Sequence, residues 1–453
     1  MTAVSATPVH PDATPAAGDA SSTKRLWSGR QDPLAGLETR SGTEARVWLP
    51  ESAEALDASV QERAVLFREG LGLPPNMLAG RSVGVLGSGG TVGVAALAFA
   101  RWGAQVHFFD SDMARRSAVM SDVTEAFGRF GLMDSLVETV DPLSADGSGA
   151  SYDFVSAETM LHGRDPVQDT LNGLKARCRP DGLVHVSCFS RRGTFVEAMI
   201  RALIAGVSAA TDKTPGEVAR TLMMIKWDRR GSARAFEAWI EGHLVNPAAR
   251  GLSPIDGGDL CRRGIATGLR LQSSAPAYRD GLYREQSGQP STVVEDIRRI
   301  DEHLSRAALG HALGLPLYYG GSLSGAGEIG ALIDAAIGAA EDCAERAEPT
   351  RFQAAAAALR ALTGLTRQCS MWVGRSGSEA AGSLLTGLSA AFDAVATGDT
   401  AAVDGFCREN TSFQALWGTP VHHILFRRDE TLDGLPRFGD YPEDQTPGRA
   451  RPA

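Results

Sequence analysis

A glycine-rich turn between an apolar run and an Ala-rich run holds the residues that could most directly do chemistry. Residues 82–87 read Ser-Val-Gly-Val-Leu-Gly, and Ser88 and Gly89 follow before the Ala-rich stretch. Glycines after a strand let the backbone turn sharply and approach a ligand, and the first N–H groups of the next helix bind polar ligand atoms. Gly87, Ser88 and Gly89 are therefore candidate binding residues for an adenosine-type cofactor.

An acidic residue follows at the end of the next apolar run. Asp110 stands there, with Ser111 after it, and a carboxylate at this distance from a glycine loop can accept hydrogen bonds from both hydroxyls of a ribose. Taken alone, this stretch does not choose between cofactors, because Gly87, Gly89 and Gly93 also fit a nicotinamide-binding loop. A tight strand-to-helix turn without a ligand is a third interpretation.

A second series of motifs distinguishes these cofactors. Its members are Tyr152-Asp153-Phe154-Val155, Glu158, Leu161-His162, Asp165-Pro166 and Arg179-Pro180-Asp181-Gly182. The series resembles the class I, Rossmann-like superfamily of S-adenosylmethionine-dependent methyltransferases. There a strand of the type aromatic-Asp-apolar-apolar leads to an acidic residue, a Leu-His turn, an Asp-Pro helix start and a basic-Pro-x-Gly turn. Dehydrogenases do not share it, and the resemblance covers residues 75–192 well and 193–275 loosely.

The resemblance implies a cofactor site in which the glycine loop lines the methionine and ribose portion of S-adenosylmethionine. Asp110 would bind the ribose diol, Asp141 would approach the adenine amine, and the residues from Glu158 onward would lie beside the sulfonium. The residues assigned to this site are Gly87, Ser88, Gly89, Asp110, Ser111, Asp141, Glu158, Thr159 and Met160. Two alternatives stay open, since Asp141 precedes Pro142 and could only start a turn, and Glu158 could be a solvated loop residue.

The first motif departs from the superfamily at two positions. An acidic residue usually precedes the first glycine by two positions, where this chain has Val85, and Thr91 replaces the usual third glycine. The missing carboxylate would normally help to hold the amino group of the cofactor. Weak cofactor affinity, a different cofactor, or a methyltransferase-like scaffold without turnover are therefore alternatives.

Methyl transfer from a sulfonium depends mainly on alignment, so a dedicated base is optional. His162 is the candidate general base because its imidazole titrates near neutral pH, although it could instead bond only to the backbone. Arg191 and Arg192 could pair with a substrate carboxylate or phosphate, or be solvated. His422 and His423 are adjacent in a presumed strand, so they point to opposite faces and are interpreted as structural.

Alternating apolar runs and helical patterns predict the elements that position these residues. The expected strands are 82–86, 105–109, 135–140, 152–157, 183–188, 269–274 and 421–427. The expected helices are 52–72, 91–102, 112–130, 166–178, 292–314, 328–346, 351–369, 378–396 and 400–410. We therefore predict an α/β fold, a doubly wound, mostly parallel seven-stranded sheet of the methyltransferase type, with a helical accessory region inserted before the last strand.

The predicted organisation has five parts. They are a disordered or extended tail at 1–50, a Rossmann-like S-adenosylmethionine-binding domain at 51–275, a helical accessory or substrate region at 276–415, the last strand at 416–430 and a C-terminal tail at 431–453. Aromatic residues of the helical region could roof a substrate pocket, form a homodimer contact or simply form a core. The sequence does not identify the methyl acceptor.

Composition narrows the class of protein. The 453 residues are 43% hydrophobic and 22% charged with a formal net charge of −9, which disfavours a nucleic-acid partner. We find neither a secretory signal pattern nor a run long enough to span a membrane. Six cysteines are scattered singly, so no metal site is expected. We therefore expect a cytoplasmic transferase in small-molecule biosynthesis, whose acceptor is a small molecule and could be a specialised metabolite. The alternative is an NAD(P)-dependent oxidoreductase.

Overall fold

The computed structural model describes most of the chain between the two predicted tails. The described residues are 49–87, 90–110, 116–137, 151–158, 167–230, 236–245, 254–278, 293–316, 326–366 and 370–432.

A seven-stranded sheet forms the centre of one lobe, with the order β3-β2-β1-β4-β5-β7-β6. Neighbours from β3 through β5 pair in parallel, whereas β7 is antiparallel to both β5 and β6. The strands are β1 (Ser82–Gly87), β2 (Gln105–Asp110), β3 (Leu136–Val137), β4 (Tyr152–Glu158), β5 (Cys178–Phe189), β6 (Leu269–Ala275) and β7 (Val421–Arg428). The predicted α/β class and seven strands are confirmed, and the sheet is mixed because β7 runs against its two neighbours.

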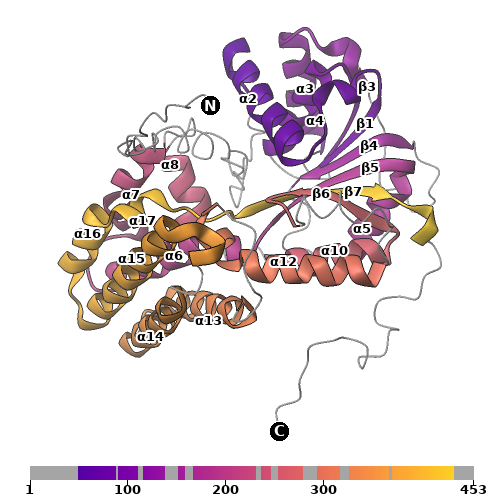
Figure 1. Cartoon of the computed structure of the whole chain (residues 1–453). Helices are drawn as coiled ribbons and strands as arrows, with labels where there is room; N and C mark the ends of the chain where they lie inside the picture. The colour runs from indigo at the N-terminus through magenta and orange to yellow at the C-terminus, as the bar shows by residue number, and fades with distance from the viewer. Residues whose placement is uncertain are drawn as a thin grey trace, which may run out of the picture.

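Helices cover both faces of the sheet, which explains why its strands are apolar on both sides (Figure 1). One face carries α2 (Ala53–Val65), the π-helical turn η1 (Leu66–Gly70), α3 (Gly90–Arg101) and α4 (Arg116–Arg129). The short turn η2 (Pro75–Leu78) precedes β1, and η3 (Met133–Ser135) precedes β3. The other face carries α5 (Val167–Arg177), α10 (Gly257–Ala266) and the first part of α12 (Val293–Leu313). The sheet is therefore doubly wound.

Helix α2 begins where its sequence predicts. Ser52 caps it by accepting a hydrogen bond from the backbone N–H of Ala55 at 3.2 Å, as Ser at an N-cap commonly does. The predicted helix 52–72 continues as η1, which ends before Leu71. Phe67 of η1 is fully buried against Phe99 of α3 and His185 of β5, so this N-terminal segment is part of the sheet's core.

A second, helical lobe packs beside the sheet (Figure 1). Its helices are α6 (Phe195–Ala209), α7 (Pro215–Arg230), α8 (Phe236–Trp239), the π-helical turn η5 (Ile240–Val245), α13 (Ala326–Glu345), α14 (Pro349–Leu365), α15 (Ser370–Thr397), α16 (Thr400–Glu409) and α17 (Thr411–Ala415). They share one apolar core with the last turns of α12. The helices from 195 to 245 thus pack with those that follow β6, while the predicted domain boundaries themselves stay a prediction.

The two lobes meet where three chain segments cross backbone to backbone. Gly193 lies in the turn η4 (Arg192–Thr194) after β5, and a Cβ there would collide with the carbonyl oxygen of Thr419. Thr419 in turn donates its N–H to the carbonyl of His311 at 2.9 Å. A side chain at position 193 would force these segments apart, so glycine is required by the close approach. A last turn, η7 (Glu430–Leu432), follows β7.

Helix α15 is apolar enough over Val373–Thr397 to span a membrane by length and composition alone. Its apolar residues Ala381, Leu384, Leu385, Leu388, Ala391 and Phe392 belong to the core of the helical lobe. The cysteines Cys178, Cys188, Cys261, Cys343 and Cys407 are buried and unbridged, and burial raises the pKa of the Cys188 thiol to about 12. The apolar residues of α15 and the buried cysteines are therefore explained by packing in the core.

Candidate functional site

Three of the predicted site residues end neighbouring strands in a single row. Gly87 of β1 is in register with Asp110 of β2 on one side and with Glu158 of β4 on the other. These strands are parallel, so all three residues lie at the same, carboxyl edge of the sheet. Adjacent strands are about 4.8 Å apart, and the carboxyl edge is where ligands of open α/β sheets bind. The tertiary structure thus brings together residues far apart in the chain.

The Glu158 carboxylate is engaged by a residue from the N-terminal helix. Arg63 of α2 donates from both terminal nitrogens, one to each carboxylate oxygen, with Nη2–Oε2 at 3.0 Å. The side chains of Arg63 and Glu158 are 12% and 5% exposed. Burial opposes the ionisation of Glu158, but the Arg63 guanidinium outweighs it, with smaller contributions from His185 and His423, and lowers its pKa to about 2. Glu158 is therefore a buried, ionised carboxylate rather than a solvated loop residue.

A chain of buried polar side chains continues from Glu158 across the same face. His185 Nδ1 lies 2.9 Å from Ser156 Oγ and 3.9 Å from Glu158 Oε1. Its Nε2 lies 3.2 Å from Nδ1 of His423, and the two rings stack with centroids 5.4 Å apart. Burial lowers the pKa of His185 to about 4 and that of His423 to about 3. Both imidazoles are therefore neutral near pH 7.

The neighbouring histidine belongs to a different cluster on the opposite face. Tyr278 Oη lies 2.5 Å from His422 Nδ1, and the His422 ring meets His311 edge to face at 5.0 Å. Burial lowers the pKa of His422 to about 3 and raises the pKa of Tyr278 well above its ordinary value. The prediction that His422 and His423 point to opposite faces is confirmed, and each is satisfied by its own partners.

Arg191 and Arg192, predicted as substrate ligands, both face helix α13. Arg192 bonds Asp334 through Nε at 3.2 Å and through Nη2 at 2.8 Å. Arg191 bonds Glu341 at 3.2 Å. Both guanidinium groups therefore form ion pairs between the lobes, and a role in substrate binding stays a prediction.

Seven of the predicted site residues lie outside the described residues. They are Ser88, Gly89, Ser111, Asp141, Thr159, Met160 and the candidate base His162. For Asp110, the structure gives its position at the end of β2 and its register with Gly87 of β1. Within the described ranges, no group of three His, Cys, Asp or Glu side chains is arranged to hold a metal ion.

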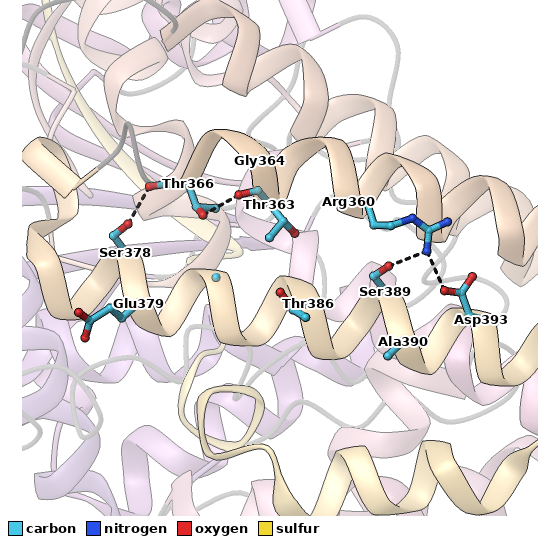
Figure 2. Close-up of a pocket in the computed structure, with 11 residues that line it drawn as sticks. Arg360, Thr363, Gly364, Thr366, Ser378, Glu379, Thr386, Ser389, Ala390 and Asp393 are labelled. Atoms are coloured by element: carbon cyan, nitrogen blue, oxygen red, sulfur yellow. Dashed lines mark hydrogen bonds and ion pairs between the residues drawn. The ribbon is translucent and has the colours of Figure 1, made fainter.

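A cavity of about 790 Å³ opens elsewhere, between α14 and α15. Figure 2 shows Arg360 on its wall, donating to Ser389 at 3.1 Å and to Asp393 at 2.7 Å. Its lining residues all lie between positions 360 and 393. None of the predicted site residues lines it, so it is separate from the row at the carboxyl edge of the sheet.

Sequence reasoning missed Arg63, His185 and Ser156 as members of this polar cluster. Ser156 and Glu158 are two residues apart in β4, so the alternation of side chains along a strand places both on one face. This spacing is visible in the sequence. No local pattern pairs Arg63 with Glu158, because the two residues are separated by 95 positions.

Comparisons with known proteins add only weak similarities. No protein-family model matches the chain, and no curated protein matches its sequence. Coclaurine N-methyltransferase bound to N-methylheliamine and SAH shares 11% identity over 92% of this chain and 88% of its own, with a TM-score of 0.31. The [4+2]-cyclase SpnF shares 12% over 90% and 95%, with a TM-score of 0.32. PKMT2 from Rickettsia typhi in complex with AdoHcy shares 15% over 54% and 49%, with a TM-score of 0.34. Similarities this low do not bear on the activity of the present chain.

Proposed function

We propose that this protein is an enzyme that binds S-adenosylmethionine at the carboxyl edge of its sheet and transfers the methyl group to a small molecule. The observation that carries the proposal is the row of Asp110, Gly87 and Glu158 at the ends of β2, β1 and β4. The strand order, with β7 antiparallel between β5 and β6, is consistent with the methyltransferase type of sheet. The motifs from Tyr152 to Gly182 support the same class.

The chemistry of the donor set fits this cofactor. Asp110 brings a carboxylate to the end of β2, where a ribose diol can donate to it. Gly87 has no side chain to block a ligand above β1. The Arg63 and Glu158 pair offers charges of both signs at the end of β4. The Asp110 carboxylate suits the ribose of the cofactor, and the two opposite charges suit the ammonium and carboxylate of its amino-acid tail.

When bound, S-adenosylmethionine supplies a methyl group on an already activated sulfur. The task of the chain is then to align the acceptor and to receive its proton, and orientation alone can lower a barrier by about 7–11 kcal/mol. Glu158 is a weak base because Arg63 lowers the pKa of its carboxyl to about 2. His162 on the segment after β4 remains the proposed proton acceptor.

The helical lobe is the proposed substrate region. Its helices come from both sides of β6 in the chain and are tied to the turn after β5 through Arg191 and Arg192. That turn lies at the carboxyl edge, beside the proposed cofactor row. We include in the proposal a cytoplasmic location, a specialised metabolite as the acceptor and a homodimer as the assembly.

Titration calorimetry with S-adenosylhomocysteine, NAD⁺ and NADP⁺ tests the proposal. We expect binding of S-adenosylhomocysteine only. The Asp110→Ala variant should lose at least roughly tenfold in affinity, because hydrogen bonds to a charged group are removed. Asp122→Ala, in the middle of α4, is a matched control that should bind like the natural protein. Binding of NAD(P) instead, or unchanged affinity of Asp110→Ala, contradicts the proposal.

A further inference from the structure

The ion pair between Arg63 and Glu158 joins the N-terminal helix to the carboxyl edge of the sheet. Glu158 ends β4 directly beside Gly87, and Arg63 reaches it from the last turn of α2. The guanidinium also lies over the Phe99 ring, 6.0 Å from its centroid. A cation and an anion are thus held in fixed positions at the end of β4, next to Gly87 of β1.

The position of this pair relative to Val85 is informative. Val85 of β1 is 1% exposed and packs in the apolar cluster beneath α2 and α3. It is in register with Ser156 of β4, and Glu158 follows Ser156 by two residues on the same face. The carboxylate missing at position 85 therefore has a counterpart on the adjacent strand, one pleat nearer the carboxyl edge.

The two charges complement an amino-acid zwitterion. A carboxylate accepts hydrogen bonds from an ammonium, and a planar guanidinium matches the geometry of a carboxylate. A guanidinium has five N–H donors, and Arg63 gives two terminal nitrogens to Glu158. The remaining N–H groups of Arg63 can therefore donate to a ligand carboxylate while the ion pair with Glu158 stays intact.

We propose that Arg63 and Glu158 form the binding site for the amino-acid tail of the cofactor, with Glu158 accepting from its ammonium and Arg63 donating to its carboxylate. This inference rests on the proposed function. It assigns to Glu158 the task of the acidic residue that Val85 replaces, and it makes helix α2 part of the cofactor site.

Two nucleosides that differ only in the tail test this assignment. S-adenosylhomocysteine carries the amino-acid zwitterion, whereas 5′-methylthioadenosine carries the same adenosine and sulfur without it. By calorimetry, Arg63→Met and Glu158→Gln should each weaken S-adenosylhomocysteine binding by roughly tenfold to a hundredfold. Binding of 5′-methylthioadenosine should change less than about threefold, because both variants leave the nucleoside contacts in place.

A second ion pair of α2 provides the matched control. Arg101 of α3 bonds Asp57 of α2 at 3.3 Å on the surface, so Arg101→Met loosens the helix without touching the proposed site. It should leave both affinities unchanged. Thermal unfolding of every variant checks the fold. If Arg63→Met is unstable, Arg63→Lys replaces it in the test. Because lysine keeps the positive charge, this variant should retain part of the affinity for the amino-acid tail.

The outcomes separate the two proposals. Equal losses for both nucleosides in Arg63→Met and Glu158→Gln mean that the pair only fastens α2, and they overturn the tail assignment. Unchanged binding of S-adenosylhomocysteine in both variants overturns it as well. If the natural protein binds neither nucleoside, the proposed function itself fails.

Discussion

His185 and His423 make the folded protein sensitive to acid. Burial lowers the pKa of His185 from 6.5 to about 4 and that of His423 from 6.5 to about 3. Between these values and 6.5 the unfolded chain binds protons that the folded chain does not. Stability is therefore fully present above about pH 6.5 and is lost as the pH falls toward 4. Glu158, with its pKa lowered from 4.5 to about 2, continues the loss below pH 4.5.

Thermal unfolding followed from pH 8 to pH 4 should show this dependence. We expect a constant midpoint above roughly pH 7 and a progressive decrease below it, because His185, His423 and the similarly shifted His422 stay unprotonated in the fold. His423→Gln should partly flatten the decrease, since one of these buried histidines no longer titrates while His185 and His422 remain. A midpoint that rises on acidification in this range would show that the histidines are charged in the folded state.

Helices and strands with clear local signals are predicted well from the sequence. The strand expected at 82–86 is β1 (Ser82–Gly87), and the helix expected at 292–314 is α12 (Val293–Leu313). Helix α7 was missed although Thr214 and Glu217 exchange hydrogen bonds at its start, which is the pattern of a capping box. Helix α10 was missed although Asp256 caps it by accepting from Asp259 N.

Gly206 sets how closely α6 approaches its neighbours. A Cβ at this position would collide with Val395 of α15 and lie 2.6 Å from the Phe352 ring of α14. Gly206→Ala should lower the free energy of unfolding by roughly 1–3 kcal/mol through overpacking, despite a gain in helix propensity of about 1 kcal/mol at most. Urea unfolding measures the difference.

Gly338 of α13 is the matched control for this prediction. A Cβ at Gly338 would meet nothing within 4 Å. Gly338→Ala should therefore stabilise the protein by up to about 1 kcal/mol, because only helix propensity changes. If both variants behave alike, the packing of α6 against α14 and α15 is looser than the structure indicates.

The sheet lobe and the helical lobe have separate apolar cores and are joined by a shared helix, a close backbone contact and ion pairs. Among the described residues, α12 contributes to both the helical core and one core of the sheet, through Ala308 and Leu309 on one side and Ile300 and Leu304 on the other. Gly193 and Thr419 pack backbone to backbone at the junction. Arg191 and Arg192 add ion pairs to α13 beside it.

The two arginines should contribute unequally to stability. Arg192 makes two hydrogen bonds to Asp334 with its side chain 24% exposed, whereas Arg191 makes one to Glu341 at 39%. Arg192→Gln should cost roughly 1.5–3 kcal/mol of unfolding free energy, and Arg191→Gln about 0–1 kcal/mol. Asp334→Asn combined with Arg192→Gln should be less than additive. A cost of about 0–1 kcal/mol for both variants would mean that solvent screens the Arg192 pair as well.

The α/β class, the seven strands and the ends of β1, β2 and β4 to within one residue can be predicted from local sequence alone. These features follow from local periodicity and from motifs within short segments, which hydrophobic burial and turn chemistry specify without knowledge of distant residues. The direction of β7, the common core of the helices on either side of β6, and the pairing of Arg63 with Glu158 were decided only by the tertiary structure. Each joins segments far apart in the chain, and burial makes such contacts strong only after the whole chain has packed around them.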